Sequence, residues 1–518
     1  MTALSEPNER VSLRAWVGFC AMGLGMFMAI LDIQVVATSL PEIRSALSIP
    51  PDQMSWVQTA YLIAEVISIP LTGWLTRMLT MRGLFTTAIA VFTMSSIGCA
   101  ASTGFASLTL WRVLQGFAGG TLIPSVFAAV FLLFPKKDEQ VAITIAGVLA
   151  VLAPTLGPIV GGWITQTYSW HWLFLINVVP GLAAGIAGFF FLPRERANLS
   201  LARAFDWTAL LCVGLSLATL EIGLKEAPQR GWLSPGILTI FVLCVASGSL
   251  FVRRTLRAPA PIVDLAALGD RRLAVGCMLS FLTGIGLYGS VYLMPVFLSF
   301  VRGHGSLRIG EIMLVTGVAQ LVSAPLVIRA ERRIDAVTLT VVGFVLFGLG
   351  LGLSASQPRD ADFHEMFWPQ AIRGVAIMLC LLPPTRVALG HLPPERVPDA
   401  SSLFNLMRNL GGAVGLALID TVIWTRAPEH SQMLLARLMA GDLDAARAIG
   451  IPESFLSGPL PSPDNPLVRS YVQPLLERAG LAAATNEAWA MVASLVLLGP
   501  IFLILSGLGR RSATTDRP

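Results

Sequence analysis

One carboxylate interrupts a long apolar stretch near the start of the chain. Residues 15–41 carry no charge between Arg14 and Asp32, and the stretch is long enough to cross a bilayer. An ionised side chain in hydrocarbon costs at least about 2.5–3.5 kcal/mol, so we expect Asp32 to face a cavity or a partner group. This placement favours a proton-handling role for Asp32; the alternative is a structural acid bound to a neighbouring helix.

Arg112 is the cation best placed to meet Asp32. Asp32 lies about eight residues from the outer end of its span and Arg112 about five from that of its own. With a rise of about 1.5 Å per residue, their depths agree within a few ångströms. A carboxyl group beside a guanidinium stays ionised, whereas one in an apolar cavity takes up a proton more readily. Alternation between these settings is what a proton-coupled carrier needs; a permanent structural ion pair is the alternative.

Glu65 is a second acid inside an apolar span. It lies about twelve residues from the outer end of the second span, which corresponds to a depth of roughly 18 Å. It could bind a proton or pair with a cationic substrate, because a carboxylate in an apolar cavity attracts lipophilic cations. The alternative is a protonated Glu65 that hydrogen-bonds a packed helix.

The composition indicates a membrane protein. Of the 518 residues, 54% are hydrophobic and 13% are charged, against about 25% charged residues in soluble domains. Apolar runs of about 20 residues predict a polytopic α-helical protein, and the alternation typical of an outer-membrane barrel is missing. The net charge of +5 does not indicate nucleic acid, because the basic residues are spread along loop edges. Six cysteines inside apolar runs and five scattered histidines predict no metal site and no cofactor.

Fourteen spans are predicted, with both termini on one side of the membrane. Lys and Arg number 22 in the inner loops and tails against 6 in the short outer loops, which places both termini in the cytoplasm. The predicted spans are 15–40, 53–75, 84–101, 108–134, 141–164, 170–192, 207–224, 236–252, 273–300, 309–328, 336–353, 366–389, 401–424 and 488–508.

One outer connection is much longer than the others. Residues 426–487 contain helical patterns at 433–450 and 468–480, on either side of a proline-rich break at 458–466. A segment of this length could dock a partner or act as a passive lid, and both alternatives stay open.

A weak internal repeat relates two of the spans. The fourth contains W-R-V-L-Q-G from Trp111 and the twelfth contains W-P-Q-A-I-R-G from Trp368, each followed by a proline, Pro124 and Pro383. An offset of eight spans is what two six-helix halves separated by an inserted hairpin would give.

Several motifs, in order, resemble those of the drug/proton antiporters of the major facilitator superfamily. They are L-D-I-Q-V-V-A-T-S-L-P-E-I in the first span, R-x-x-Q-G-x-x-G-G-x-x-x-P from Arg112 in the fourth, and A-P-T-L-G-P-I-V-G-G at 153–162 in the fifth. Matches at 170–181, 261–265, 367–374 and 392–415 narrow the resemblance to the fourteen-helix branch, the EmrB/QacA group.

The resemblance implies an all-α integral membrane protein with the major facilitator fold. Two six-helix bundles, residues 1–193 and 259–518, are expected to flank an inserted two-helix hairpin at 194–258, with the extracytoplasmic segment 426–487 in the second bundle. In the family, an acid at the place of Asp32 and the fourth-span arginine relay protons. Asp32 and Arg112 are therefore the expected proton-coupling residues, and Glu65 is a further candidate.

The fifth span predicts a gate between the two bundles. Prolines bend a helix and glycines allow a neighbouring helix to approach closely, and in the resembled family this motif marks exporters. The expected gating residues are Pro154, Gly157, Pro158, Gly161 and Gly162. Simple packing through Gly157 and Gly161 is the alternative.

The loop after the second span departs from the family pattern. The superfamily usually has G-x-x-x-D-R-x-G-R, whereas this chain has Arg77 in place of the acid and Thr80 in place of a glycine. Because the acid normally latches the inner side of the two halves, the departure puts that latch in doubt.

Candidates for a substrate cavity are aromatic and amide side chains, although such residues more often pack against helices or face lipid. They are Tyr61, Gln115, Tyr292, Phe404 and Asn405. Arg408, in the inner third of its span, is expected to extend toward the inner headgroups.

A secondary active exporter is the leading hypothesis, moving lipophilic drugs or toxic small molecules outward in exchange for protons. No G-x-x-x-x-G-K-[S/T] motif occurs, which argues against ATP as the energy source. A proton-coupled uptake permease of the same fold is the alternative, and a membrane-embedded transferase is a remote one. The expected location is the bacterial cytoplasmic membrane. The resembled relatives pass substrate there to a periplasmic adaptor and an outer-membrane channel, and segment 426–487 could dock such an adaptor.

Overall fold

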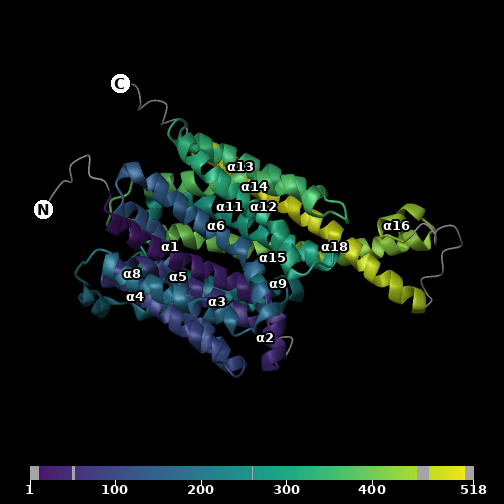
Figure 1. The fold of residues 1–518 in the computed structure, drawn as a ribbon, viewed down its shortest axis with the longest axis horizontal. Coiled ribbons are helices and arrows are strands. Elements are labelled where there is room, and N and C mark those ends of the chain that lie inside the picture. The colour runs from purple at the N-terminus through teal and green to yellow at the C-terminus, as the bar shows by residue number, and fades with distance from the viewer. Residues whose placement is uncertain (1–10, 50–52, 259–260, 452–465, 508–518) are drawn as a thin grey trace.

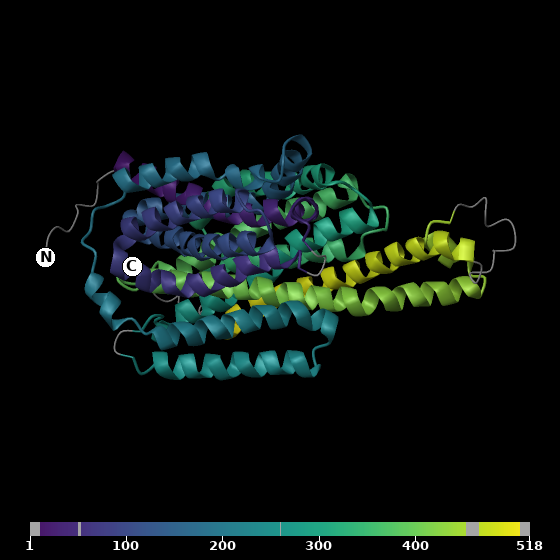
Figure 2. The same cartoon turned by 90° about the horizontal axis from the view of Figure 1, so that it is seen from below.

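The described parts of the chain are mostly helical. The computed structural model describes residues 11–49, 53–258, 261–451 and 466–507, and all regular structure in these ranges is helical (Figures 1 and 2). The proline-rich break predicted at 458–466 lies almost entirely outside them.

The helix bounds follow the predicted spans with few exceptions. The first helices are α1 (Leu13–Thr38), α2 (Leu40–Leu47), α3 (Trp56–Ser68), α4 (Thr72–Ala100), α5 (Phe105–Leu133), α6 (Lys136–Thr167), α7 (Trp172–Leu175) and α8 (Val178–Phe191). A hairpin of α9 (Trp207–Arg230) and α10 (Pro235–Thr255) follows. The remaining helices are α11 (Arg271–Val296), α12 (Ser306–Glu331), α13 (Ala336–Leu353), α14 (Phe363–Leu389), α15 (Val397–Met439), α16 (Leu443–Ala448), α18 (Pro466–Val496) and α19 (Leu498–Leu505). Short 3₁₀ or π turns lie at Ile69–Leu71, Leu199–Ala204, Leu265–Gly269, Phe297–Val301 and Ser354–Ser356.

Thirteen helical segments among the described residues are long and apolar enough to cross a membrane. One of them, Trp56–Ala100, has 45 residues, about twice the 20 or so that one crossing needs. It is interrupted at Thr80, where φ is 71° and ψ is 163°. Counting this segment as two crossings gives the fourteen predicted spans, and the number of crossings remains a prediction.

The helices pack in two groups that meet along a seam. In the N-terminal group α1 contacts α5, α6 and α8, and in the C-terminal group α11 contacts α14, α15 and α18. Across the seam, α6 packs against α12, and α15 packs against α4 and α5. The division into units 1–193, 194–258 and 259–518 remains a prediction.

Glycines let helices approach backbone to backbone in both groups. A Cβ on Gly116 of α5 would lie 2.2 Å from the carbonyl oxygen of Tyr61 on α3. A Cβ on Gly411 of α15 would lie 2.0 Å from the carbonyl oxygen of Phe281 on α11. Small residues at such contacts are what close packing of membrane helices requires, and the first contact brings the Tyr61 ring to α5.

The α9–α10 hairpin covers one side of the seam, where α9 contacts both α3 and α15. Lys225 on α9 donates hydrogen bonds to Ser55 Oγ (3.0 Å) and Thr59 Oγ1 (2.6 Å). Trp232, between α9 and α10, donates to Thr421 Oγ1 on α15 at 3.0 Å. The hairpin is therefore bonded to both groups of helices.

α15 and α18 project together beyond the other helices, away from the end where the chain starts and finishes (Figures 1 and 2). We call the described part of 426–487 the arm. The helices extend beyond the predicted spans, because α15 continues to Met439 and α18 begins at Pro466, and most of the helical patterns predicted at 433–450 and 468–480 lie on α15, α16 and α18. Arg426 and Glu487, at the start of the arm, form an ion pair between the two helices with a closest distance of 2.7 Å. An apolar cluster holds the tip together, made of Leu438, Ala445, Ala446, Ile449 and Leu476.

Candidate functional site

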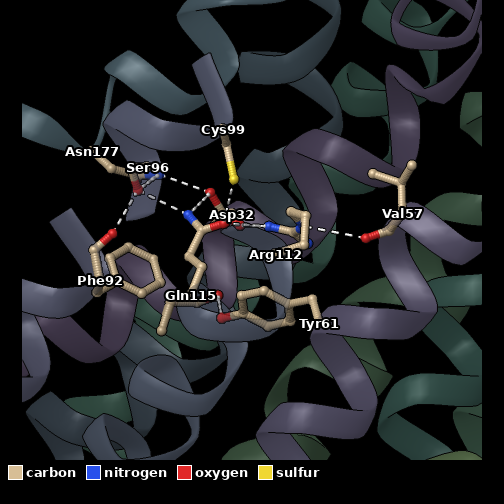
Figure 3. A network of polar contacts seen from close by, with 10 residues as sticks. Asp32, Val57, Tyr61, Phe92, Ser96, Cys99, Arg112, Gln115 and Asn177 are labelled. Carbon is tan, nitrogen blue, oxygen red and sulfur yellow. Dashed lines mark hydrogen bonds and ion pairs between the residues drawn. The ribbon is translucent and has the colours of Figure 1, made fainter. Parts of the chain in front are cut away.

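Asp32 lies at the centre of a buried network between α1, α4, α5 and α8 (Figure 3). One carboxylate oxygen forms an ion pair with Arg112 on α5. The other accepts hydrogen bonds from Gln115 Nε2 at 3.0 Å and from Asn177 Nδ2, at the start of α8, at 2.7 Å. Asp32 is 1% exposed and Arg112 is 0% exposed, so both oxygens are satisfied and the pair is shielded from water.

Further contacts fix the direction of the Arg112 side chain. Its Nε donates to the carbonyl oxygen of Val57 at 3.3 Å, and its Nη1 also donates to Gln115 Oε1 at 2.7 Å. The guanidinium carbon lies 4.2 Å from the centre of the Tyr61 ring, whose hydroxyl donates to the carbonyl oxygen of Ala29 on α1 at 3.2 Å. The stacked ring and the carbonyl group hold the guanidinium toward the acid on α1.

Asn177, Ser96 and Cys99 complete the network, although the sequence did not predict them. Ser96 Oγ accepts from Gln115 Nε2 at 2.8 Å, and Cys99 Sγ lies 3.6 Å from Gln115 Oε1. An asparagine inside an apolar span needs a polar partner, so Asn177 carried a usable signal. A serine can bond its own helix backbone, as Ser96 does to the carbonyl oxygen of Phe92 at 3.0 Å, and gives no such signal.

Glu65 on α3 has a different environment. It is 2% exposed, and its carboxylate has no hydrogen bond or ion pair with any residue that the structure describes. Arg112 and Glu221 on α9 lie within electrostatic range of it. Glu65 is therefore a buried acid that remains available to a ligand or a proton.

A narrow central cavity lies between the two groups of helices. Its volume is about 30 Å³, which is room for about one water molecule, so this conformation is nearly closed around it. The cavity is lined by Ile30, Gln34, Ile69, Ile123, Ala150, Val151, Pro154, Leu287, Tyr288, Val291, Leu381, Asn405, Arg408 and Asn409.

Arg408 lines this cavity, and the prediction that it extends to the headgroups is wrong. The residue is 6% exposed, and its guanidinium carbon lies 5.4 Å from the ring centre of Phe127 and 5.3 Å from that of Phe404. The reason is that the first part of α15 packs against α4 and α5, so protein rather than lipid surrounds this level of the helix.

The five residues predicted for a substrate cavity lie in four places. Asn405 lines the central cavity. Tyr61 and Gln115 belong to the buried network described above. Phe404 is 1% exposed beneath the cavity-lining guanidinium, and Tyr292 is 37% exposed and outside the lining.

The predicted gating residues lie on α6, which is wedged between α1 and α12. A Cβ on Gly157 would lie 2.2 Å from Cβ of Gln34 on α1, and a Cβ on Gly310 of α12 would lie 2.1 Å from Cγ1 of Ile159 on α6. Pro154 lines the central cavity. The other gating residues are buried on the same helix: Pro158, Gly161 and Gly162.

An ion pair joins the two groups where the sequence put the latch in doubt. Arg77 on α4 pairs with Asp399 in the first turn of α15 and donates to the carbonyl oxygen of Pro261 at 3.3 Å. Nearby, Ser401 Oγ donates to the carbonyl oxygen of Pro124 on α5 at 2.8 Å. The arginine that replaces the family's acid is thus itself paired with an acid. This ion pair connects the two groups of helices where α4 meets the start of α15.

Comparisons with known proteins identify the class. The model of the Major Facilitator Superfamily matches residues 22–416, and the chain belongs to this superfamily. Within it, the chain belongs to the EmrB/QacA group of drug antiporters. The colistin resistance protein EmrB of Acinetobacter baumannii is 39% identical over 421 residues, covering 81% of this chain and 82% of that protein. The fatty acid resistance protein FarB of Neisseria gonorrhoeae is 30% identical, with 82% and 83% covered. The multidrug export protein EmrB of Escherichia coli K12 is 29% identical over 500 residues, with 94% and 93% covered.

Solved structures share the fold. The human organic anion transporter MFSD10 (TETRAN) has a TM-score of 0.59 at 15% identity, covering 94% of this chain and 99% of that one. The proton:xylose symporter XylE has a TM-score of 0.58 at 12% identity, with 96% of both chains covered. These structures show the fold, while the superfamily match and the long apolar helices show that the chain is a multi-pass membrane protein.

Proposed function

We propose that the chain is a proton-coupled antiporter that exports lipophilic drugs or toxic small molecules by alternating access. The observation that carries the proposal is the buried pair of Asp32 on α1 and Arg112 on α5. A guanidinium favours the charged form of a carboxyl group, and an apolar cavity favours the neutral form. A shift of α1 relative to α5 would therefore let the carrier bind a proton in one conformation and release it in the other.

Three further features support this proposal. Glu65, buried and without a partner among the described residues, is proposed as a second site for a proton or a cationic substrate. α6, with its two prolines inside the helix, is proposed as the gate at the seam. The related proteins named for multidrug export, and for resistance to colistin and fatty acids, support a lipophilic substrate.

The excess of Lys and Arg in the predicted inner loops supports a location in the bacterial cytoplasmic membrane with both termini inside. In that orientation the arm extends into the periplasm. It projects away from the other helices instead of folding over them (Figure 1), which favours docking of a periplasmic adaptor, and through it an outer-membrane channel, over a passive lid.

Everted membrane vesicles from a pump-deficient host test the function. Respiration builds a pH gradient across these vesicles, and the fluorescence of an acridine dye reports it. With the wild type, addition of a transported compound is expected to dissipate this gradient. Asp32→Asn should abolish this response, whereas Asp32→Glu, the matched control, keeps the acid and should retain part of it. An equal response of Asp32→Asn contradicts the role of Asp32. A wild type that takes up substrate without releasing protons favours the uptake permease.

A further inference from the structure

Arg408 is a buried cation that lines the central cavity and has no anionic partner among the residues that the structure describes. Its Nε and Nη2 have no hydrogen-bond partner, and no ion pair involves it within the described part of the chain. The rings of Phe127 and Phe404 hold the guanidinium. Ring contacts favour a cation but leave its charge uncompensated. A guanidinium out of water needs an anion, and a carboxylate fits its planar set of donors with two parallel hydrogen bonds.

We propose that Arg408 is the specificity residue that binds the acidic group of amphipathic anionic substrates in the central cavity. The inference rests on the proposed export function and names the substrate class that this side of the cavity takes. The substrate chemistry is a carboxylate or a similar acid on an apolar body. Its apolar body fits the rest of the lining, which is largely aliphatic, from residues such as Ile30, Ile123 and Leu381.

Neighbouring polar groups on α15 and α11 keep this site on the C-terminal side of the cavity. Asn405 and Asn409 line the cavity within one turn of Arg408. The Tyr288 hydroxyl donates to Asn409 Oδ1 at 2.8 Å, so it is already engaged. The guanidinium therefore supplies the free donors to a ligand.

Two buried groups of opposite charge lie near Tyr288: Arg408, which lines the cavity, and Glu65, which is not one of the lining residues. Tyr288 lies within electrostatic range of both Arg408 on α15 and Glu65 on α3. An anionic head group near Arg408 is attracted there and repelled by an ionised Glu65, while a cationic head group has the reverse preference. Charge should therefore draw anionic head groups toward Arg408 and cationic head groups toward Glu65.

The cavity must widen before a ligand enters. At about 30 Å³ it cannot hold an alkyl chain, so binding requires the seam along α6 and α12 to open. Arg408 lines the cavity, whereas Arg373, a buried arginine of the same group of helices, does not. Affinity for the anion should depend on the first arginine and not on the second.

The test compares two probes of equal chain length, dodecanoate and dodecyltrimethylammonium. Binding to the purified full chain is measured by tryptophan fluorescence in nanodiscs made only of phosphatidylcholine, so that no anionic lipid competes. We expect Arg408→Gln to weaken dodecanoate binding at least tenfold and leave dodecyltrimethylammonium binding within twofold. Arg408→Lys, which keeps the charge without the planar donors, should lose less. Arg373→Gln is the matched control and should leave both affinities unchanged.

Glu65→Gln supplies the reverse comparison and should weaken binding of the cation while leaving or improving that of the anion. Equal loss of both probes in Arg408→Gln and Arg408→Lys, or unchanged dodecanoate binding, overturns the proposal. A wild type that binds only the cation also overturns it, while substrate-driven proton release in vesicles leaves the export function standing. Absence of that proton release with every compound overturns the export function itself.

Discussion

The two groups of helices hold their buried arginines in opposite settings. In the N-terminal group, Arg112 is paired with Asp32. In the C-terminal group, Arg373 on α14 is 2% exposed, and its Nε and Nη1 have no partner among the residues that the structure describes. Its guanidinium carbon lies 5.2 Å from the ring centre of Trp489. Burial of the charge is similar on both sides, and only the acid is missing from one of them.

The internal repeat shows how this difference arises. On α5, the arginine and the glutamine of W-R-V-L-Q-G both bind the carboxylate of Asp32. On α14, alignment of the motif glycines places Gln370 at the position of the arginine and Arg373 at that of the glutamine. Both bind the hydroxyl of Thr316, at 3.1 and 3.3 Å. In the first half the shared partner is an acid on α1, whereas here it is a hydroxyl on α12, a helix that the repeat does not match with α1. A hydroxyl does not titrate near neutral pH, so this part of the C-terminal group has no counterpart to the proton site.

Replacement of each arginine by methionine should give the largest contrast. Arg112→Met leaves the buried carboxylate of Asp32 without its cation, and loss of one partner from a buried pair costs about 3–5 kcal/mol. Arg373→Met removes a guanidinium that has no acid partner, so we expect a change within about 1 kcal/mol, or a gain in stability. Thermal unfolding of the purified proteins measures both effects.

The double variant Asp32→Asn with Arg112→Met is the control for this contrast. It removes both charges and should recover part of the stability that Arg112→Met loses. Equal destabilisation by Arg112→Met and Arg373→Met would show that the interactions of Arg373 stabilise the protein as much as the ion pair of Arg112 does. The comparison between the two groups would then be wrong.

The latch between the two groups should give an intermediate effect. Asp399 is 4% exposed at its side chain and Arg77 is 33% exposed, so the pair is only partly screened by water. We expect Arg77→Asp and Asp399→Arg each to lower the thermal midpoint and slow transport. The double exchange should restore both, with a coupling energy of about 1–2 kcal/mol in a double-mutant cycle. Additive losses in the cycle would show that the ion pair does not connect the groups.

The sequence predicted the meeting of Asp32 and Arg112 because helix rise converts residue counts into depth. It could not predict that Asn177 joins them, because the facing side of a helix depends on how its neighbours pack. The pair of Arg77 and Asp399 was hidden because the family pattern places an acid where Arg77 stands, and the partner lies far along the chain.

The continuity of α15 and α18 into the arm and the position of Arg408 escaped prediction for related reasons. Charges at Arg426 and Glu487 resembled the ends of two spans, yet they pair with each other and the helices continue. The depth of Arg408 in its span suggested a position near the lipid headgroups. That prediction failed because span depth does not show which helices pack around a residue. Depth is encoded locally in the sequence, whereas lateral neighbours are set by the whole fold.

Thr80 offers a smaller test near the latch. Its φ of 71° is costly for a β-branched residue, whereas glycine adopts it freely. Thr80→Gly should therefore stabilise the protein by about 1 kcal/mol. This gain is reduced by loss of the hydrogen bond that Gly83 N donates to Thr80 Oγ1 at 3.3 Å. Thr80→Ala is the control, because it loses the same bond and keeps the strain. A thermal midpoint of Thr80→Gly at or below that of Thr80→Ala would mean that the break in α4 stores no strain.

The smallest effect is expected at a second aspartate–arginine ion pair, whose aspartate lies outside the membrane-spanning segments. Asp206 precedes α9 and pairs with Arg254 at 2.5 Å, and the side chains are 16% and 48% exposed. The hydrogen bond from Arg254 lowers the pKa of Asp206 below its ordinary value. A carboxyl group with a lowered pKa stabilises the folded state at pH values above its unfolded pKa, and this stabilisation disappears as the pH falls through the folded value.

Asp206→Asn should lower the thermal midpoint at pH 7 by about 1 °C or less, because exposed pairs contribute little. Asparagine caps a helix as well as aspartate does, so the substitution removes the charge and keeps the N-terminal cap of α9. The two melting curves should converge as the pH falls below about 4, near the ordinary pKa of aspartate. Arg254→Gln should show the same small loss and the same convergence. A loss as large as that of Arg112→Met would mean that burial does not set the strength of these pairs, and the contrast between the two groups of helices would need another cause.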